Sequence, residues 1–179
     1  MKKLFRKALI VMLSISTLLN LCSCRMEESY KEFNIKNITD NLSENYFTSD
    51  KFDFARLENV VFIPEIKEVN HGEYIIYISA YSETGTEQIK IKNVILKENE
   101  VVLLDHKLNK EILLEENSES IFEGWIDGGT FTEEEIDIID GKEFDFIIQA
   151  EIIKEDKSVS ENITFEILVK GYKSFVTPT

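Results

Sequence analysis

The stretch Ile163-Thr164-Phe165-Glu166-Ile167-Leu168-Val169-Lys170 decides the fold class of this chain. Every odd-numbered residue in it is a large apolar one, whereas the even-numbered positions are mostly polar. Successive side chains of a β-strand point to opposite faces of the sheet, so a period of two predicts a strand with one buried face. We therefore expect the odd-numbered side chains of this segment to line a hydrophobic core.

The same alternation recurs along the chain before this segment and brings the expected number of strands to seven or eight. The clear cases are 144–152, 74–80 and the segment that begins with Ile89 and Ile91, and weaker runs lie at 60–69, 100–105, 110–115 and 119–126. Turn signals separate them at Asn70-His71-Gly72, Glu83-Thr84-Gly85 and Asp127-Gly128-Gly129. Short strands divided by turns predict a mainly β protein, an antiparallel β-sandwich of immunoglobulin-like architecture, with a barrel as the alternative.

One segment interrupts the alternation between two expected strands. In Phe131-Thr132-Glu133-Glu134-Glu135-Ile136, Thr132 and Glu135 have the spacing of a helix capping box, and Phe131 and Ile136 that of a hydrophobic staple. Asp140-Gly141 then supplies a stop signal. We expect a short helical turn near 133–139 that crosses between the sheets.

The first residues have the features of a secretory signal, which we expect to form a helix before it is removed. Met1 to Lys7 carries four positive charges and no acidic residue, and a mostly apolar run from Ala8 to Leu21 follows. That run is shorter than the ~20 apolar residues that a membrane-spanning helix needs. The sequence Leu21-Cys22-Ser23-Cys24 resembles the lipobox of bacterial lipoproteins.

The resemblance implies that the signal peptide, residues 1–23, is cleaved and that Cys24 becomes a lipidated N-terminus. Diacylglycerol and palmitate-type acyl chains on Cys24 would then hold the protein at the cell membrane or outer membrane, on the extracytoplasmic side. Two acyl chains anchor a protein stably where one binds only marginally. Because Cys22 leaves with the signal and Cys24 carries the lipid, no cysteine remains for a disulfide, a thiol nucleophile or a metal site.

The charge balance limits the partners of the mature chain. Removal of the four basic residues of the signal leaves 16 basic and 34 acidic residues, a net charge of about −18. Nucleic-acid binding depends on basic residues that neutralise phosphates, so this acidic balance argues against a nucleic-acid partner. An anionic lipid surface repels such a domain, so we expect it to stand away from the membrane on its anchor.

The expected domain organisation has three parts after the signal. Residues 24–32 form the lipidated cysteine and a linker, residues 33–57 dock on the sandwich, and residues 58–179 are the β-sandwich itself. The docking prediction follows from the aromatic and aliphatic residues of 33–57, which a flexible spacer lacks. We expect residues 33–54 to cover part of the outer face of the strands, which carries the apolar side chains of Ile75, Tyr77, Ile147, Ile153 and Leu168.

No motif of an enzyme or a metal site is present, so we expect no catalytic activity, no metal and no cofactor. His71 lies in a turn signal and His106 near a strand end, and neither has the spacing of metal ligands. Asp127, Asp137 and Asp140 match no calcium-binding loop. Trp125, the single tryptophan, has two interpretations: a core residue, which we favour, or an exposed aromatic that contacts a partner.

These features predict a membrane-anchored extracytoplasmic lipoprotein that acts as a protein-binding module. The alternative is a small-ligand-binding protein or hydrolase that works outside the cytoplasm, which would need a concave pocket with convergent polar groups. A third candidate is a structural or immunity-type lipoprotein that blocks another protein.

Overall fold

The computed structural model describes residues 26–36, 38, 47, 50–118, 120–154 and 157–176. The signal segment and Cys24 lie outside the described residues. The chain divides into two units, and residues Tyr30–Tyr172 form the larger one. In the smaller unit, residues 26–29 and 173–176 are in strand conformation. The core and the candidate site both lie in the larger unit.

The described part of the chain contains ten strands and one 3-10 helix. They are β1 (Met26–Ile35), η1 (Asp50–Ala55), β2 (Arg56–Leu57), β3 (Val60–Asn70), β4 (Glu73–Ser82), β5 (Gln88–Glu98), β6 (Val101–Ile112), β7 (Glu115–Glu116), β8 (Phe122–Thr132), β9 (Glu143–Lys154) and β10 (Lys157–Val176).

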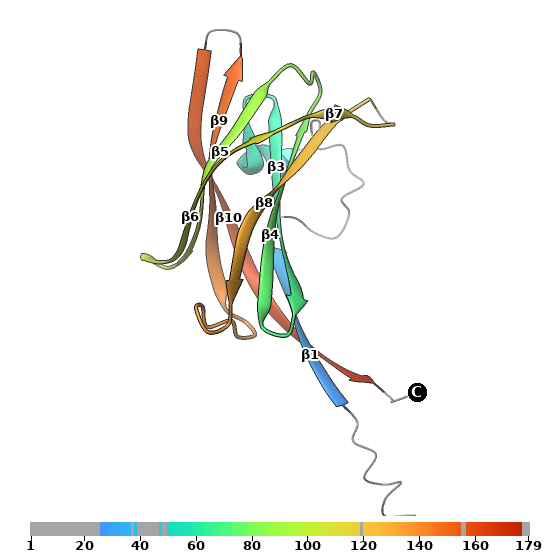
Figure 1. Ribbon diagram of the computed structural model, residues 1–179, viewed down its shortest axis with the longest axis vertical. Helices are drawn as coiled ribbons and strands as arrows, with labels where there is room; N and C mark the ends of the chain where they lie inside the picture. The colour runs from blue at the N-terminus through green and yellow to red at the C-terminus, as the bar shows by residue number, and fades with distance from the viewer. Residues whose placement is uncertain are drawn as a thin grey trace, which may run out of the picture. The chain divides into compact units, whose positions relative to one another are not determined.

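The strands form two five-stranded sheets that make a β-sandwich (Figure 1). Sheet A has the order β1-β10-β9-β5-β6, and sheet B has the order β2-β3-β4-β8-β7. The chain crosses from one sheet to the other after β1, after β4, after β6 and after β8. With β3-β4-β8 opposite β6-β5-β9-β10, the strand order is that of strands A-B-E opposite C′-C-F-G in immunoglobulin-like domains. The predicted fold class is confirmed.

The core lies between the sheets and is built from the alternating residues that the sequence singles out. In β10, Ile163, Phe165, Ile167 and Val169 are all buried, at 4% exposure or less. The inward residues of β9 and β4 are buried as well, and the rings of Phe146 and Phe165 meet edge to face at 6.4 Å. Complete burial of such a side chain stabilises the fold by about 1.5–3 kcal/mol, so the two rows of apolar side chains hold the sheets together.

Three details of the strands differ from the sequence prediction. The described residues form ten strands where the alternation predicts seven or eight, because β1 and the two-residue strands β2 and β7 carry no clear alternation. The runs 100–105 and 110–115 are not two strands, because β6 is continuous from Val101 to Ile112. Two irregularities in its pairing with β5 interrupt the period of two there. Asp127-Gly128-Gly129 is not a turn but a bulge within β8, where the pairing with β4 shifts between Ile76 and Tyr77.

The predicted helical turn near 133–139 is present as a single turn over 132–136. The amide N–H groups of Glu135 and Ile136 both donate to the Thr132 carbonyl, at 3.1 and 3.0 Å. The Glu135 carboxylate accepts from the Thr132 N–H at 2.8 Å, as a capping box requires. The chain then runs on without helical structure to β9.

The N-terminal region differs from its prediction, first in the segment expected to be a linker. Residues 26–32 are not a flexible linker, because they lie in β1, which is hydrogen-bonded to β10 in sheet A. The two strands are antiparallel: the Lys36 N–H donates to the Glu166 carbonyl at 2.9 Å, and Tyr30 stacks on Tyr172. Among the described residues no helix combines the length and apolar character needed to cross a membrane.

The docking of segment 33–57 on the outer faces of the strands is wrong for its described residues. Phe33 packs edge to face against the inward-facing rings of Tyr74 and Phe131, and Phe54 packs likewise against Phe165. Phe52 is itself buried in the core, at 3% exposure. These side chains therefore fill the sandwich between its sheets. Of the outward-facing apolar residues named above, Ile147 is buried, and Ile75, Tyr77, Ile153 and Leu168 are half-buried.

Candidate functional site

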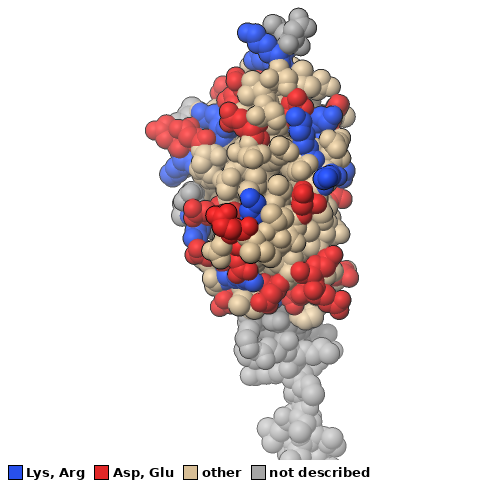
Figure 2. Space-filling model, turned by 90° about the vertical axis from the view of Figure 1, so that its left-hand side faces the viewer, with Lys and Arg blue, Asp and Glu red and all other residues tan. Residues whose placement is uncertain are grey.

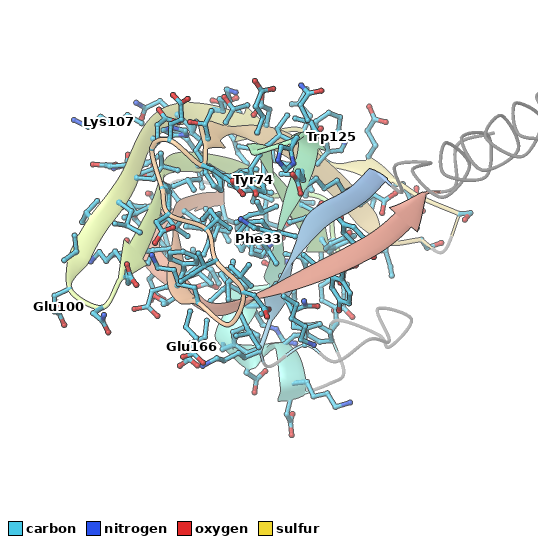
Figure 3. All side chains as sticks on the ribbon, turned by 90° about the horizontal axis from the view of Figure 1, so that it is seen from below. Phe33, Tyr74, Glu100, Lys107, Trp125 and Glu166 are labelled. Atoms are coloured by element: carbon cyan, nitrogen blue, oxygen red, sulfur yellow. The ribbon has the colours of Figure 1, made fainter. Side chains whose placement is uncertain are left out.

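Trp125 lies on the surface, so the prediction that it belongs to the core is wrong. The residue is 65% exposed, the highest value among the exposed aromatic residues described. It occupies an odd-numbered position of β8, and the neighbouring Ile126 faces inward and is buried. In Figure 3, Trp125 lies at the periphery of the sandwich, whereas Phe33 and Tyr74 lie near its centre.

The outer face of sheet B surrounds Trp125 with a mixed aromatic and polar surface. Trp125 pairs with Ser79 of β4. Tyr77 and Tyr81 lie two residues before and after Ser79, so their side chains point to the same face. The Tyr77 and Trp125 rings meet edge to face, with centroids 5.8 Å apart. On the other side of Tyr77, the Lys67 ammonium lies 5.6 Å from the centre of its ring. This face therefore already holds a cation against an aromatic ring.

A groove of about 460 Å³ runs beside Trp125 at the β8–β7 edge of sheet B. Among the described residues that line it are Trp125, Tyr81, Leu113, Glu115, Glu116 and Glu123, and none of the lining residues is lysine or arginine. Leu113 is 78% exposed. The groove therefore presents apolar surface and negative charge together.

The glutamates of the groove include a like-charge pair. Glu115 of β7 lies directly opposite Glu123 of β8 in the antiparallel ladder, so both side chains point to the face that carries Trp125. No ion pair among the described residues involves either carboxylate. Like charges directly opposite each other in a sheet destabilise it. The fold thus keeps an unfavourable arrangement at this place.

The free edge of β8 is covered farther along by side chains of β6. Lys110 Nζ donates to the Asp127 carbonyl at 2.8 Å, and His106 Nδ1 donates to the Gly128 carbonyl at 3.2 Å. Gly129, at φ +106°, gives His106 its place, since a Cβ there would overlap the imidazole. His106 therefore protects a strand edge, and His71 is exposed in the β3–β4 turn.

The backbone of Trp125 also points to this edge. The Asn117 N–H donates to the Ile121 carbonyl at 2.8 Å, and the Asp127 carbonyl accepts from Lys110. In an antiparallel sheet, successive residues of a strand direct their backbone groups to opposite sides. The odd-numbered residues of β8 therefore direct theirs away from β4. β7 ends at the pair Glu115–Glu123. No described residue outside β4 is seen to hydrogen-bond the Trp125 amide or carbonyl, which lie between that last pair and the covered Asp127 carbonyl, and the Leu113 carbonyl lies against the neighbouring Gly124.

A second polar cluster surrounds the buried carboxylate of Glu87, in the crossing from β4 to β5. Glu87 is 6% exposed and accepts hydrogen bonds from Ser82 Oγ at 2.7 Å, from Thr84 Oγ1 and from Asn59 Nδ2. Burial raises the pKa of the Glu87 carboxyl, but these three hydrogen bonds outweigh it and lower the pKa to about 2. The three donors are neutral, and the Lys154 ammonium of β9 lies 3.7 Å from Glu87 Oε1, so the cluster fixes the crossing from β4 to β5.

A third cluster lies at the opposite end of β4. The Tyr74 hydroxyl donates to Glu133 Oε1 at 2.7 Å, and the Lys31 ammonium donates to the same carboxylate and to the Ile138 carbonyl. The Glu133 carboxyl has a lowered pKa, first because of Lys31 and then because of Tyr74. Burial raises the pKa of Tyr74. These contacts join β1 to the β8–β9 crossing, which is a structural role.

The candidate residues named from the sequence are distributed as follows. Cys24 lies outside the described residues, and Trp125 lies in the groove. The described residues contain no group of three histidine, cysteine or acidic side chains that could hold a metal ion. Glu115, Glu116 and Glu123 form no recognisable motif in the sequence, because their proximity depends on the short pairing of β7 with β8.

Comparison with protein-family models, with curated proteins and with solved structures finds no significant match. Function is therefore inferred from the residues of this chain alone.

Proposed function

We propose that this chain is an extracytoplasmic lipoprotein, anchored by a lipid on Cys24, whose β-sandwich serves as a protein-binding module. The observation that carries the anchor is the sequence Leu21-Cys22-Ser23-Cys24 after a basic start and a short apolar run. The exposed Trp125 beside its groove supports the binding role, since tryptophan is enriched among the residues that dominate binding energy in protein interfaces.

The charge of the domain fits this placement. Figure 2 shows the side of the sandwich formed by sheet A, where basic side chains are interspersed with acidic residues and uncharged surface. The groove on sheet B is lined by acidic residues and by none that is basic. The net charge of about −18 disfavours direct contact with anionic lipid. The anchor and the groove would then have separate tasks, one toward the membrane and one toward a partner.

The anchor is tested by expressing the full precursor in a bacterium with labelled palmitate and measuring the intact mass of the purified protein. We expect label incorporation, a mature chain that begins at Cys24 with a diacylglyceryl group, and partition into the detergent-rich phase. Cys24→Ser should abolish all three, whereas the matched variant Cys22→Ser should keep them. An unmodified mature chain, or label that depends on Cys22, would contradict the proposal.

A further inference from the structure

We propose that the groove beside Trp125 binds an extended segment of a protein partner through an arginine or lysine side chain. This inference rests on the proposed function as a binding module, to which it adds a site and a partner chemistry. Three features of sheet B carry it: the glutamate pair, the exposed tryptophan, and the Trp125 backbone groups that point to the sheet edge.

The glutamate pair favours a cationic ligand. Glu115 and Glu123 are opposite each other on adjacent strands, and Glu116 also lines the groove. In such hydrogen-bonded pairs the Cα atoms are about 5.5 Å apart, so the two carboxylates repel each other at short range. A guanidinium or ammonium group placed between them would remove that repulsion and gain charge-assisted hydrogen bonds. The groove is thus complementary to positive charge and supplies none of its own.

Trp125 favours the same ligand. Its indole lies on the same outer face as the two carboxylates, two residues along β8 from Glu123. Cations bind more strongly over the face of tryptophan than over tyrosine or phenylalanine. Lys67 over Tyr77 shows that this surface accommodates such a contact at 5.6 Å. An arginine side chain can lay its methylene stem against Trp125 and Leu113 and extend its guanidinium toward the glutamates.

The backbone at this place suits an extended partner. The amide and carbonyl of Trp125 point to the sheet edge past the end of β7. An extended partner can hydrogen-bond to the Trp125 amide and carbonyl. It cannot pair farther along β8, because Lys110 and His106 already donate to the Asp127 and Gly128 carbonyls. Register is thereby limited, and an arginine in the partner is directed into the groove.

The test is a binding titration monitored by the emission of Trp125, the single tryptophan of the chain. The protein is the mature lipoprotein in nonionic detergent, and the probe is a capped peptide of alternating threonine and arginine. We expect a saturable change in emission. The double variant Glu115→Gln/Glu123→Gln should weaken binding roughly tenfold at physiological salt, because two charge contacts are lost.

The matched control is Glu100→Gln/Glu161→Gln, which makes the same change in net charge at exposed positions away from the groove. It should change the dissociation constant by less than about twofold. Equal weakening by both double variants would show attraction by the overall charge and would overturn the proposal. Thermal melting of each variant checks that the fold is kept.

Two further probes complete the test. The same peptide with citrulline in place of arginine should bind at least about tenfold more weakly, because it lacks the positive charge. A neutral chito-oligosaccharide should leave Trp125 emission unchanged. Equal binding of the citrulline peptide, saturable binding of the sugar, or no response to the arginine peptide would each overturn the inference. None of these outcomes bears on the lipid at Cys24, so the anchor can stand if the groove fails.

Discussion

The carboxylates of Glu87, in the crossing from β4 to β5, and of Glu115, in β7, have different surroundings. Glu87 is buried and accepts hydrogen bonds from Ser82, Thr84 and Asn59. Glu115 is exposed, faces another glutamate and has no ion pair among the described residues. The sandwich therefore hydrogen-bonds a carboxylate to protein groups where it is buried, and leaves another to solvent beside an exposed tryptophan. The first carboxylate has a structural role, and the second is accessible to the basic ligand proposed above.

The largest effect on this comparison is expected from Glu87→Ala. The substitution leaves the Ser82 hydroxyl buried without its acceptor and releases two more donors, so it should lower the free energy of unfolding by about 3 kcal/mol. Urea denaturation at pH 7 measures it. Glu83→Ala, in the same crossing but exposed, is the matched control and should change stability by less than about 0.5 kcal/mol. Similar losses in both variants would show that Glu87 has no special role.

The next effect is the pH dependence that Glu87 confers. Its pKa in the folded protein, about 2, is below the ordinary value of 4.5, so the unfolded state takes up the proton first as the pH falls. The stabilisation by Glu87 is therefore complete above about pH 4.5 and is lost as the pH falls toward 2. Relative to Glu87→Gln, the wild-type protein should lose about 2 kcal/mol of its advantage over this interval. Urea denaturation of both proteins at several pH values tests this, and a constant difference would contradict it.

Tyr74→Phe should have a smaller effect at the other end of β4. The hydroxyl donates to Glu133, which also accepts from Lys31, so the carboxylate keeps one partner after the substitution. The phenyl ring that remains would still pack against Phe33 and Phe131, and the expected loss is about 1 kcal/mol. Chemical denaturation measures it, with Tyr77→Phe on the exposed face as control. A loss as large as that of Glu87→Ala would mean that this cluster is the more important one.

The strands of the core were predictable from the sequence because burial on one face requires an apolar residue at every second position. Each inward position of β10 and β9 needs an apolar side chain, so the period of two survives in the residues themselves. β6 lacks this regular alternation, because two irregularities in its pairing with β5 shift its side chains between faces. Its sequence therefore resembles two short strands. Gly128-Gly129 reads as a turn for a related reason: glycine serves turns and bulges alike.

The candidate site could be predicted only in part. Trp125 stands out as the single tryptophan, but its face depends on which neighbours of β8 are buried, and the two glycines and Asp127 around it blur the alternation. The pairing of Glu115 with Glu123 is made by β7, a strand of two residues that is too short to show a period of two in the sequence. β1 takes its strand structure from pairing with the distant β10. A very short strand and a long-range pairing thus account for the parts that the alternation does not predict.

The smallest predicted effect has the opposite sign and separates the two kinds of carboxylate most directly. Glu115→Gln removes the repulsion from Glu123 while keeping the size of the side chain. It should therefore raise the free energy of unfolding by about 0.3 kcal/mol. Urea denaturation at low ionic strength resolves the gain best, because salt screens the repulsion. If the groove binds a basic segment, this stabilised variant should also bind the arginine peptide less well. A residue that weakens the fold and strengthens binding is retained for binding. A stability loss on Glu115→Gln would instead place Glu115 with Glu87, as a structural carboxylate.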